Sequence, residues 1–108
     1  EGSGKGFDLM LAKQICSAVK IPVIIHGGAG NMQHVLDLTK DLSLSGVAIA
    51  SLFHYDCILH NRQIDGYEEE GNIDFLKSNR VLSSIESTSI KELKSFLIEN
   101  NIACRINE

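Results

Sequence analysis

The chain has 108 residues, of which 44% are hydrophobic, and its net charge is −4. This length allows one domain at most, and the apolar content is that of a globular protein rather than a disordered one. The acidic balance argues against a nucleic-acid surface, and no apolar run approaches the roughly 20 residues that span a bilayer. We therefore expect a cytoplasmic protein with no nucleic-acid or membrane partner.

The cysteines do not predict a metal or disulfide site. Cys16, Cys57 and Cys104 are odd in number, widely spaced and outside any C-x-x-C pattern, so we expect reduced, partly buried thiols. The acidic run Glu68–Glu70 is typical of a solvated face. The sequence therefore predicts neither a metal nor a cofactor.

The first part of the chain predicts a helix and then a strand. A glycine-rich stretch at residues 2–6 precedes Asp8, which we expect to cap a helix. Apolar residues at three- and four-residue spacing predict that this helix continues to about Lys20. The β-branched run Ile21–Ile25 then predicts a strand covered on both faces in a parallel sheet, with Pro22 tolerated only at its start.

The segment from Pro22 to Asn31, PVIIHGGAGN, is the most informative part of the chain. An apolar strand runs into a glycine turn, and Asn31 caps a second helix behind it. Glycines remove the Cβ atoms that would keep a ligand off the backbone, while a helix N-terminus adds N–H donors and a partial positive charge. Because the dinucleotide spacing and the P-loop lysine are both missing, two interpretations stay open: a phosphate site or a plain tight turn.

A second strand and a second polar turn follow. Gly46–Ala50 predicts a buried strand that begins 25 residues after Ile21, about the length of a βαβ crossover. Ser51 comes directly after this strand, and we expect it to cap a short helix with its hydroxyl and backbone N–H toward a ligand. Two neighbouring strand ends would then carry turns that favour anions.

The rest of the chain predicts an insert and a final helix. The polar pattern from Asp56 to Ser89 predicts an inserted loop, with one short helix near residues 73–78. Ser89 and Glu92 form a capping-box pattern ahead of an amphipathic helix that ends near Asn100. A short extended tail is expected after it.

These elements predict an α/β fold with two parallel strands whose apolar pattern requires neighbours on both edges. We interpret residues 1–108 as part of a single domain, the C-terminal βα units of a (β/α)8 TIM barrel, with the insert at about residues 56–89. An incomplete barrel of this kind is also expected to self-associate.

Several motifs carry a resemblance to a known family; they are Gly2–Asp8, Ile21–His34, Ala48–His54, Ile90–Lys94 and Ile102–Ile106. In this order and spacing they resemble the C-terminal part of the cyclase subunit of imidazole glycerol phosphate synthase, a (β/α)8 barrel of histidine biosynthesis, or a paralogue of that subunit. The resemblance covers most of the chain outside the insert.

The resemblance implies a lyase that takes ammonia from a glutaminase partner and forms imidazole glycerol phosphate and aminoimidazole carboxamide ribotide, with no cofactor. It implies that a phosphorylated, ribose-derived substrate places one phosphate at the turns corresponding to Gly27, Gly28, Ala50 and Ser51. The family's two catalytic aspartates end strands 1 and 5 of the barrel. We therefore expect no catalytic residue in this segment, and no activity from the segment alone.

Three features depart from the family pattern. His26 stands where serine is usual before the glycine pair, and Glu1 replaces an aspartate, so both are candidate substrate contacts together with Gly2 and Ser3. For His26 a second interpretation stays open, a hydrogen bond to a neighbouring loop. The insert replaces a very short link. Two alternatives therefore stay open: a paralogue that amidates a sugar of a surface polysaccharide, and a catalytically silent fragment that binds phosphate.

The other histidines are interpreted as structural. His34 on the second helix and His60 in the insert are expected at the surface, and His54 is expected to pack near a helix end.

Overall fold

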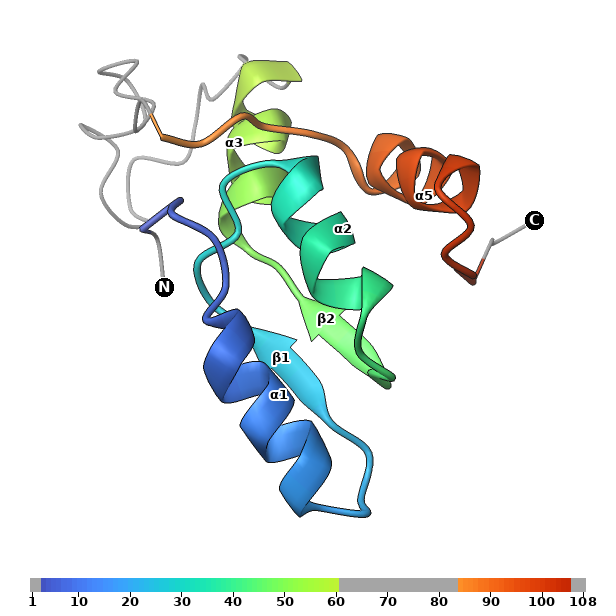
Figure 1. Ribbon diagram of the computed structural model, residues 1–108. Helices are drawn as coiled ribbons and strands as arrows, with labels where there is room; N and C mark the ends of the chain where they lie inside the picture. The colour runs from blue at the N-terminus through green and yellow to red at the C-terminus, as the bar shows by residue number, and fades with distance from the viewer. Residues whose placement is uncertain (1–2, 61–83, 106–108) are drawn as a thin grey trace.

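The computed structural model describes residues 3–60 and 84–105. Their elements, in chain order, are α1 (Leu9–Ala18), β1 (Ile24–His26), α2 (Met32–Lys40), β2 (Gly46–Ala48), α3 (Ser51–His60) and α5 (Ile90–Glu99). Figure 1 shows α1 and α2 along the strand pair, α3 extending beyond the end of β2, and α5 beside α2. The short helix predicted near residues 73–78 lies outside the described residues.

The two strands form the predicted parallel pair, connected through α2. The register places Ile24 opposite Gly46 and His26 opposite Ala48. β1 begins two residues beyond Pro22, so each strand is shorter than the apolar run that predicted it. Only residues that pair with the other strand form β-strand, because a strand is defined by its ladder of hydrogen bonds.

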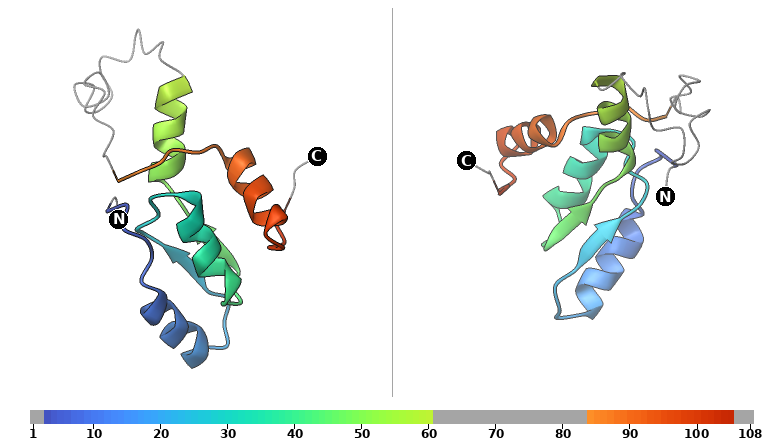
Figure 2. Two further views of the ribbon diagram at one scale, coloured as in Figure 1. Left: turned by 45° about the horizontal axis from the view of Figure 1, so that its top comes forward. Right: turned by 180° about the vertical axis from the view of Figure 1, so that it is seen from behind.

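One face of this sheet is exposed in the described part of the chain; the apolar pattern predicts cover on both faces, by neighbours that we expect outside this segment. Seen from behind, the strands lie in front of α1 and α2 (Figure 2, right). Ile24 is 64% exposed, and His26 and Ala48 are also exposed, whereas Ile25 and Val47 are half-buried. Side chains alternate between the faces of a strand, so the exposed set identifies the face opposite the helices. The described part of the chain covers one face only.

α1 begins at the predicted cap, since the Asp8 carboxylate accepts a hydrogen bond of 2.9 Å from the Leu11 N–H. It ends at Ala18, two residues before the predicted end. Of its apolar residues only Ala12 is buried, and Met10 is 73% exposed. The helix therefore forms as predicted, but much of its apolar stripe has no partner among the described residues.

The core lies on the helix side of the sheet. Val35 and Leu36 of α2 pack with Leu93 and Leu97 of α5. A second cluster joins α3 to the segment before α5, through Leu52, Tyr55 and Ile85. Together the two clusters hold α3 and α5 against the connection between the strands.

α3 is longer than predicted, because residues 56–60, assigned to the insert, continue the helix. Tyr55 and Ile58 pack on the cluster around Ile85, and this long-range contact favours the extra turn. At its end, His60 Nδ1 lies 2.9 Å from the Asp56 carbonyl and 3.2 Å from the Asp56 carboxylate. The carbonyl, and then the carboxylate, raise the pKa of the exposed His60.

The predicted capping box at the start of α5 is confirmed. The Glu92 N–H donates to the Ser89 hydroxyl at 3.2 Å, and the Ser89 N–H donates to the Glu92 carboxylate at 2.9 Å. The hydroxyls of Ser89 and of the buried Thr88 also lie within hydrogen-bond distance of that carboxylate. These donors, the Ser89 N–H first, hold the pKa of Glu92 below its usual value of 4.5.

The lowered pKa of Glu92 predicts an acid-sensitive helix. A carboxyl whose pKa is lower in the folded state stabilises that state above its unfolded pKa, and this contribution disappears as pH falls through the folded value. We expect the free energy of unfolding to decrease as pH is lowered below 4.5. In Glu92→Gln this part of the slope should be absent, as measured by urea denaturation at a series of pH values. An identical slope in the variant would contradict the assignment.

Candidate functional site

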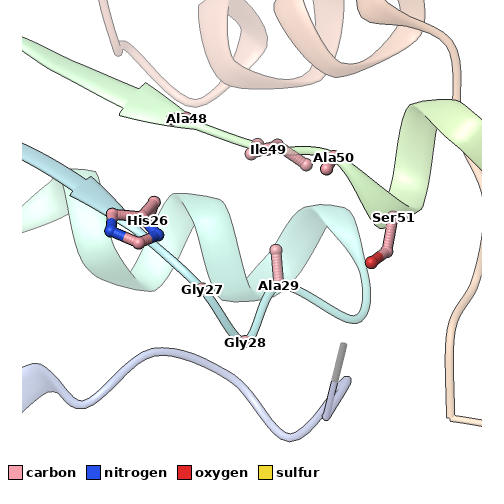
Figure 3. A pocket seen from close by; sticks show the side chains of 8 residues that line it. All are labelled: His26, Gly27, Gly28, Ala29, Ala48, Ile49, Ala50 and Ser51. Carbon is pink, nitrogen blue, oxygen red and sulfur yellow. The ribbon is translucent and has the colours of Figure 1, made fainter. Parts of the chain in front are cut away.

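A pocket of about 310 Å³ lies where the two strands end. Because parallel strands place their carboxyl ends at the same edge of a sheet, the turns that follow β1 and β2 adjoin. The turns line the pocket with eight residues, shown in Figure 3: His26, Gly27, Gly28, Ala29, Ala48, Ile49, Ala50 and Ser51. The structure therefore brings together the four residues predicted to bind phosphate and the predicted contact His26.

The glycine turn has a backbone that few other residues adopt. Gly27 and Gly28 have φ angles of 89° and 98°, in the left-handed region that favours glycine. The loop before α1 crosses this turn, and the Gly6 N–H donates to the Gly28 carbonyl at 2.8 Å. A Cβ atom on Gly28 would overlap the carbonyl oxygen of Gly6, and one on Gly30 would overlap that of Gly4.

This crossing adds a second reason for the glycines. The sequence suggested that they clear space for a ligand, and Gly28 and Gly30 also clear space for another part of the backbone. Without Cβ atoms at these two positions, the two peptide segments can approach this closely. The close approach fixes the path of the turn, and the pocket is built on that path.

The pocket also contains the N-terminus of α3. The His54 N–H donates to the Ala50 carbonyl at 2.9 Å, so the helix begins with Ser51 and Ala50 holds the cap position. The prediction that Ser51 itself is the cap is therefore wrong by one residue. The first N–H groups of a helix have no partner inside it and carry a partial positive charge. Figure 3 shows the Ser51 side chain directed toward the glycine turn.

Ser3, a further predicted contact, is not among the residues that line the pocket. The Ser3 hydroxyl lies 3.4 Å from the Lys5 N–H, and the Ser3 carbonyl accepts a hydrogen bond of 3.3 Å from the Ser84 hydroxyl. Glu1 and Gly2 lie outside the described residues. Within residues 3–60 and 84–105, no group of three His, Cys, Asp or Glu side chains is arranged to hold a metal.

His34 is a residue near the site that the sequence analysis missed. It was expected at the surface, but it is half-buried and its Nδ1 accepts the Gly30 N–H at 3.1 Å. The backbone N–H of His34 donates to the side-chain oxygen of Asn31 at 3.0 Å. The arrangement is a capping box displaced by one residue, because the side chain three positions after the cap accepts from the residue before the cap. The spacing of three residues between Asn31 and His34 is the sequence feature that could have predicted this contact.

A second missed contact involves the segment that precedes α5. The Glu86 N–H donates to the Gly30 carbonyl at 2.7 Å, and the Thr88 N–H to the Leu52 carbonyl at 3.4 Å. These bonds attach the segment to the glycine turn and to the first turn of α3. No local sequence pattern predicts these bonds, because the two residues that each bond joins are far apart in the sequence.

The sequence model of a family described as "Histidine biosynthesis protein" matches residues 1–59, which contain the whole pocket. The chain belongs to this histidine biosynthesis family. α5 and its capping box lie beyond the match. A relative in the family, the imidazole glycerol phosphate synthase subunit HisF of Methanopyrus kandleri, is 38% identical over 55 residues. The aligned part is 51% of this chain and 20% of the relative, so the chain spans about a fifth of that protein's length.

No helix in the described part of the chain is long and apolar enough to cross a membrane. Of its cysteines, Cys16 and Cys104 are half-buried as expected, while Cys57 is exposed.

Proposed function

We propose that this chain is part of the cyclase subunit of imidazole glycerol phosphate synthase. In the proposed reaction, ammonia from a glutaminase partner closes the imidazole ring of imidazole glycerol phosphate and releases aminoimidazole carboxamide ribotide in the cytoplasm. The family match over residues 1–59 and the 38% identical relative support the proposal.

The role proposed for the segment itself is to hold one phosphate of a ribose-derived substrate. The observation that carries this role is the meeting of the glycine turn and the N-terminus of α3 in one pocket. Helix N-terminal N–H groups and the hydroxyl of Ser51 are donors that suit phosphate oxygens. The exposed imidazole of His26 lines the same pocket.

Phosphate binding of this kind positions a substrate without reacting with it. Energy gained at a remote phosphate orients the reacting atoms elsewhere in the active site. We propose that the acid–base groups of the reaction lie outside these 108 residues, and that the 108-residue chain alone does not turn over substrate.

Calorimetric titration with ribose 5-phosphate, inorganic phosphate and ribose tests the proposed role. We expect the two phosphate-containing compounds to bind and ribose to show no measurable binding, because the donors in the pocket are directed at an anion. Equal binding of ribose and ribose 5-phosphate would contradict a phosphate site.

The position of His26 keeps one alternative enzyme open. It lines the pocket at a position where the cyclase pattern has a serine, so a different sugar phosphate is a candidate ligand. This alternative is a paralogue that uses ammonia to amidate a sugar of a surface polysaccharide. Aspartates at the ends of both strand 1 and strand 5 in the full-length gene would favour the cyclase, and loss of either would favour the paralogue.

We also propose that the chain self-associates through its open sheet face and the neighbouring apolar residues. Ile21 and Ile24 are 71% and 64% exposed, and an apolar strand face open to water favours contact with a second copy. Sedimentation velocity should show dimers or larger species that Ile24→Ser weakens. A stable monomer at all concentrations would contradict self-association.

A further inference from the structure

The glycine turn of the pocket is held at Gly30 from two sides. The Gly30 N–H donates to His34 Nδ1 at 3.1 Å, and its carbonyl accepts the Glu86 N–H at 2.7 Å. Gly30 is buried, so an N–H left without a partner there would cost the desolvation of a polar group. His34 therefore satisfies a buried donor just behind the turn that lines the pocket.

The same imidazole lies against the second glycine segment. A Cβ atom placed on Gly6 would be 3.5 Å from Cδ2 of His34, so the ring fills the space beside Gly6 at ordinary contact distance. Gly6 in turn donates its N–H to the Gly28 carbonyl. The ring of His34 thus supports the turn directly through Gly30 and indirectly through Gly6, while it is not part of the pocket lining itself.

We propose that His34 is a positioning residue for the phosphate pocket, and that it acts through the hydrogen bond that its Nδ1 accepts from the Gly30 N–H. The inference rests on the proposed phosphate site. Removing the acceptor leaves a buried N–H without its partner directly behind the turn, so the turn is held less firmly and anion binding weakens.

Two variants separate positioning from simple packing. His34→Asn keeps an acceptor oxygen near the place of Nδ1. His34→Leu places an apolar side chain there and removes the acceptor. Sulfate is the probe, because its charge stays constant where phosphate titrates. At pH 8 we expect His34→Leu to bind sulfate about five- to tenfold more weakly than the wild-type chain, and His34→Asn to bind within about twofold of it.

Rescue by the retained acceptor is the readout that a packing role alone would not change. If His34 only filled space, His34→Leu would bind sulfate at least as well as His34→Asn, whereas the hydrogen-bonding role requires the opposite order. If His34→Leu does not fold, the affinity of His34→Asn relative to the wild-type chain decides the question.

The outcomes distinguish the two proposals. Sulfate binding by His34→Leu equal to that of the wild-type chain, or binding by His34→Asn more than about fivefold weaker than wild type, overturns the positioning role and leaves the phosphate site intact. Absence of sulfate and phosphate binding in the wild-type chain overturns the phosphate site itself, and the positioning role with it.

Discussion

Replacing Gly28 by alanine is expected to destabilise the chain by about 2–6 kcal/mol, enough to unfold a large fraction of it. Two effects add: an alanine at a φ of 98° is strained by about 1–3 kcal/mol, and forced overpacking costs about 1–3 kcal/mol more. The overpacking arises because the new Cβ would overlap the Gly6 carbonyl oxygen. Urea denaturation followed by circular dichroism measures the loss.

Gly46→Ala is the matched control for this prediction. A Cβ on Gly46 would lie 3.8 Å from the Ile24 side chain, an ordinary van der Waals contact. We expect the free energy of unfolding of this variant to stay within about 1 kcal/mol of the wild-type value. If Gly28→Ala were as stable as Gly46→Ala, the backbone crossing at the turn would be wrong. Gly28 variants are also unsuitable as ligand tests, because they disturb folding first.

Ser51→Asp is expected to weaken phosphate binding at least about 100-fold while leaving the fold intact. Two like charges about 4 Å apart repel by about 4 kcal/mol in a partly exposed site, which exceeds the energy of a hundredfold loss. An acidic residue in the first turn of a helix is favourable by about 0.3–1 kcal/mol, and α3 has none. Calorimetry and thermal denaturation on the same sample measure affinity and stability.

Two controls define the Ser51→Asp effect. Ser51→Ala removes one hydroxyl donor and should cost about five- to tenfold in affinity. Ser45→Asp adds the same charge at an exposed position just before β2, at the opposite end of the strand. Equal weakening by Ser45→Asp and Ser51→Asp would show that net charge, rather than the pocket, governs binding.

The features that the sequence predicted well are local ones. Asp8, Asn31 and the Ser89–Glu92 pair cap their helices as expected, because a cap depends on residues within one turn of each other. The two turns also adjoin as predicted, since the order strand, helix, strand places both strand ends at one edge.

The features that could not be predicted depend on distant parts of the chain. The contact of Gly6 with Gly28 and the bond from Glu86 to Gly30 join segments whose separation leaves no local pattern. His34 was assigned to the surface because a polar residue on a helix usually faces water, while here Gly30 and Gly6 cover it. The exposed strand face has another reason: the apolar pattern of the strands predicts covering neighbours, and the described residues do not supply them.

A nuclear magnetic resonance titration of the ¹⁵N-labelled chain with inorganic phosphate tests the phosphate site itself. We expect saturable shifts concentrated at the amides of Gly27, Gly28 and Ser51, with no comparable change along α1. Absence of saturable shifts at these three amides, or equal shifts along α1, would contradict a phosphate site at the ends of β1 and β2.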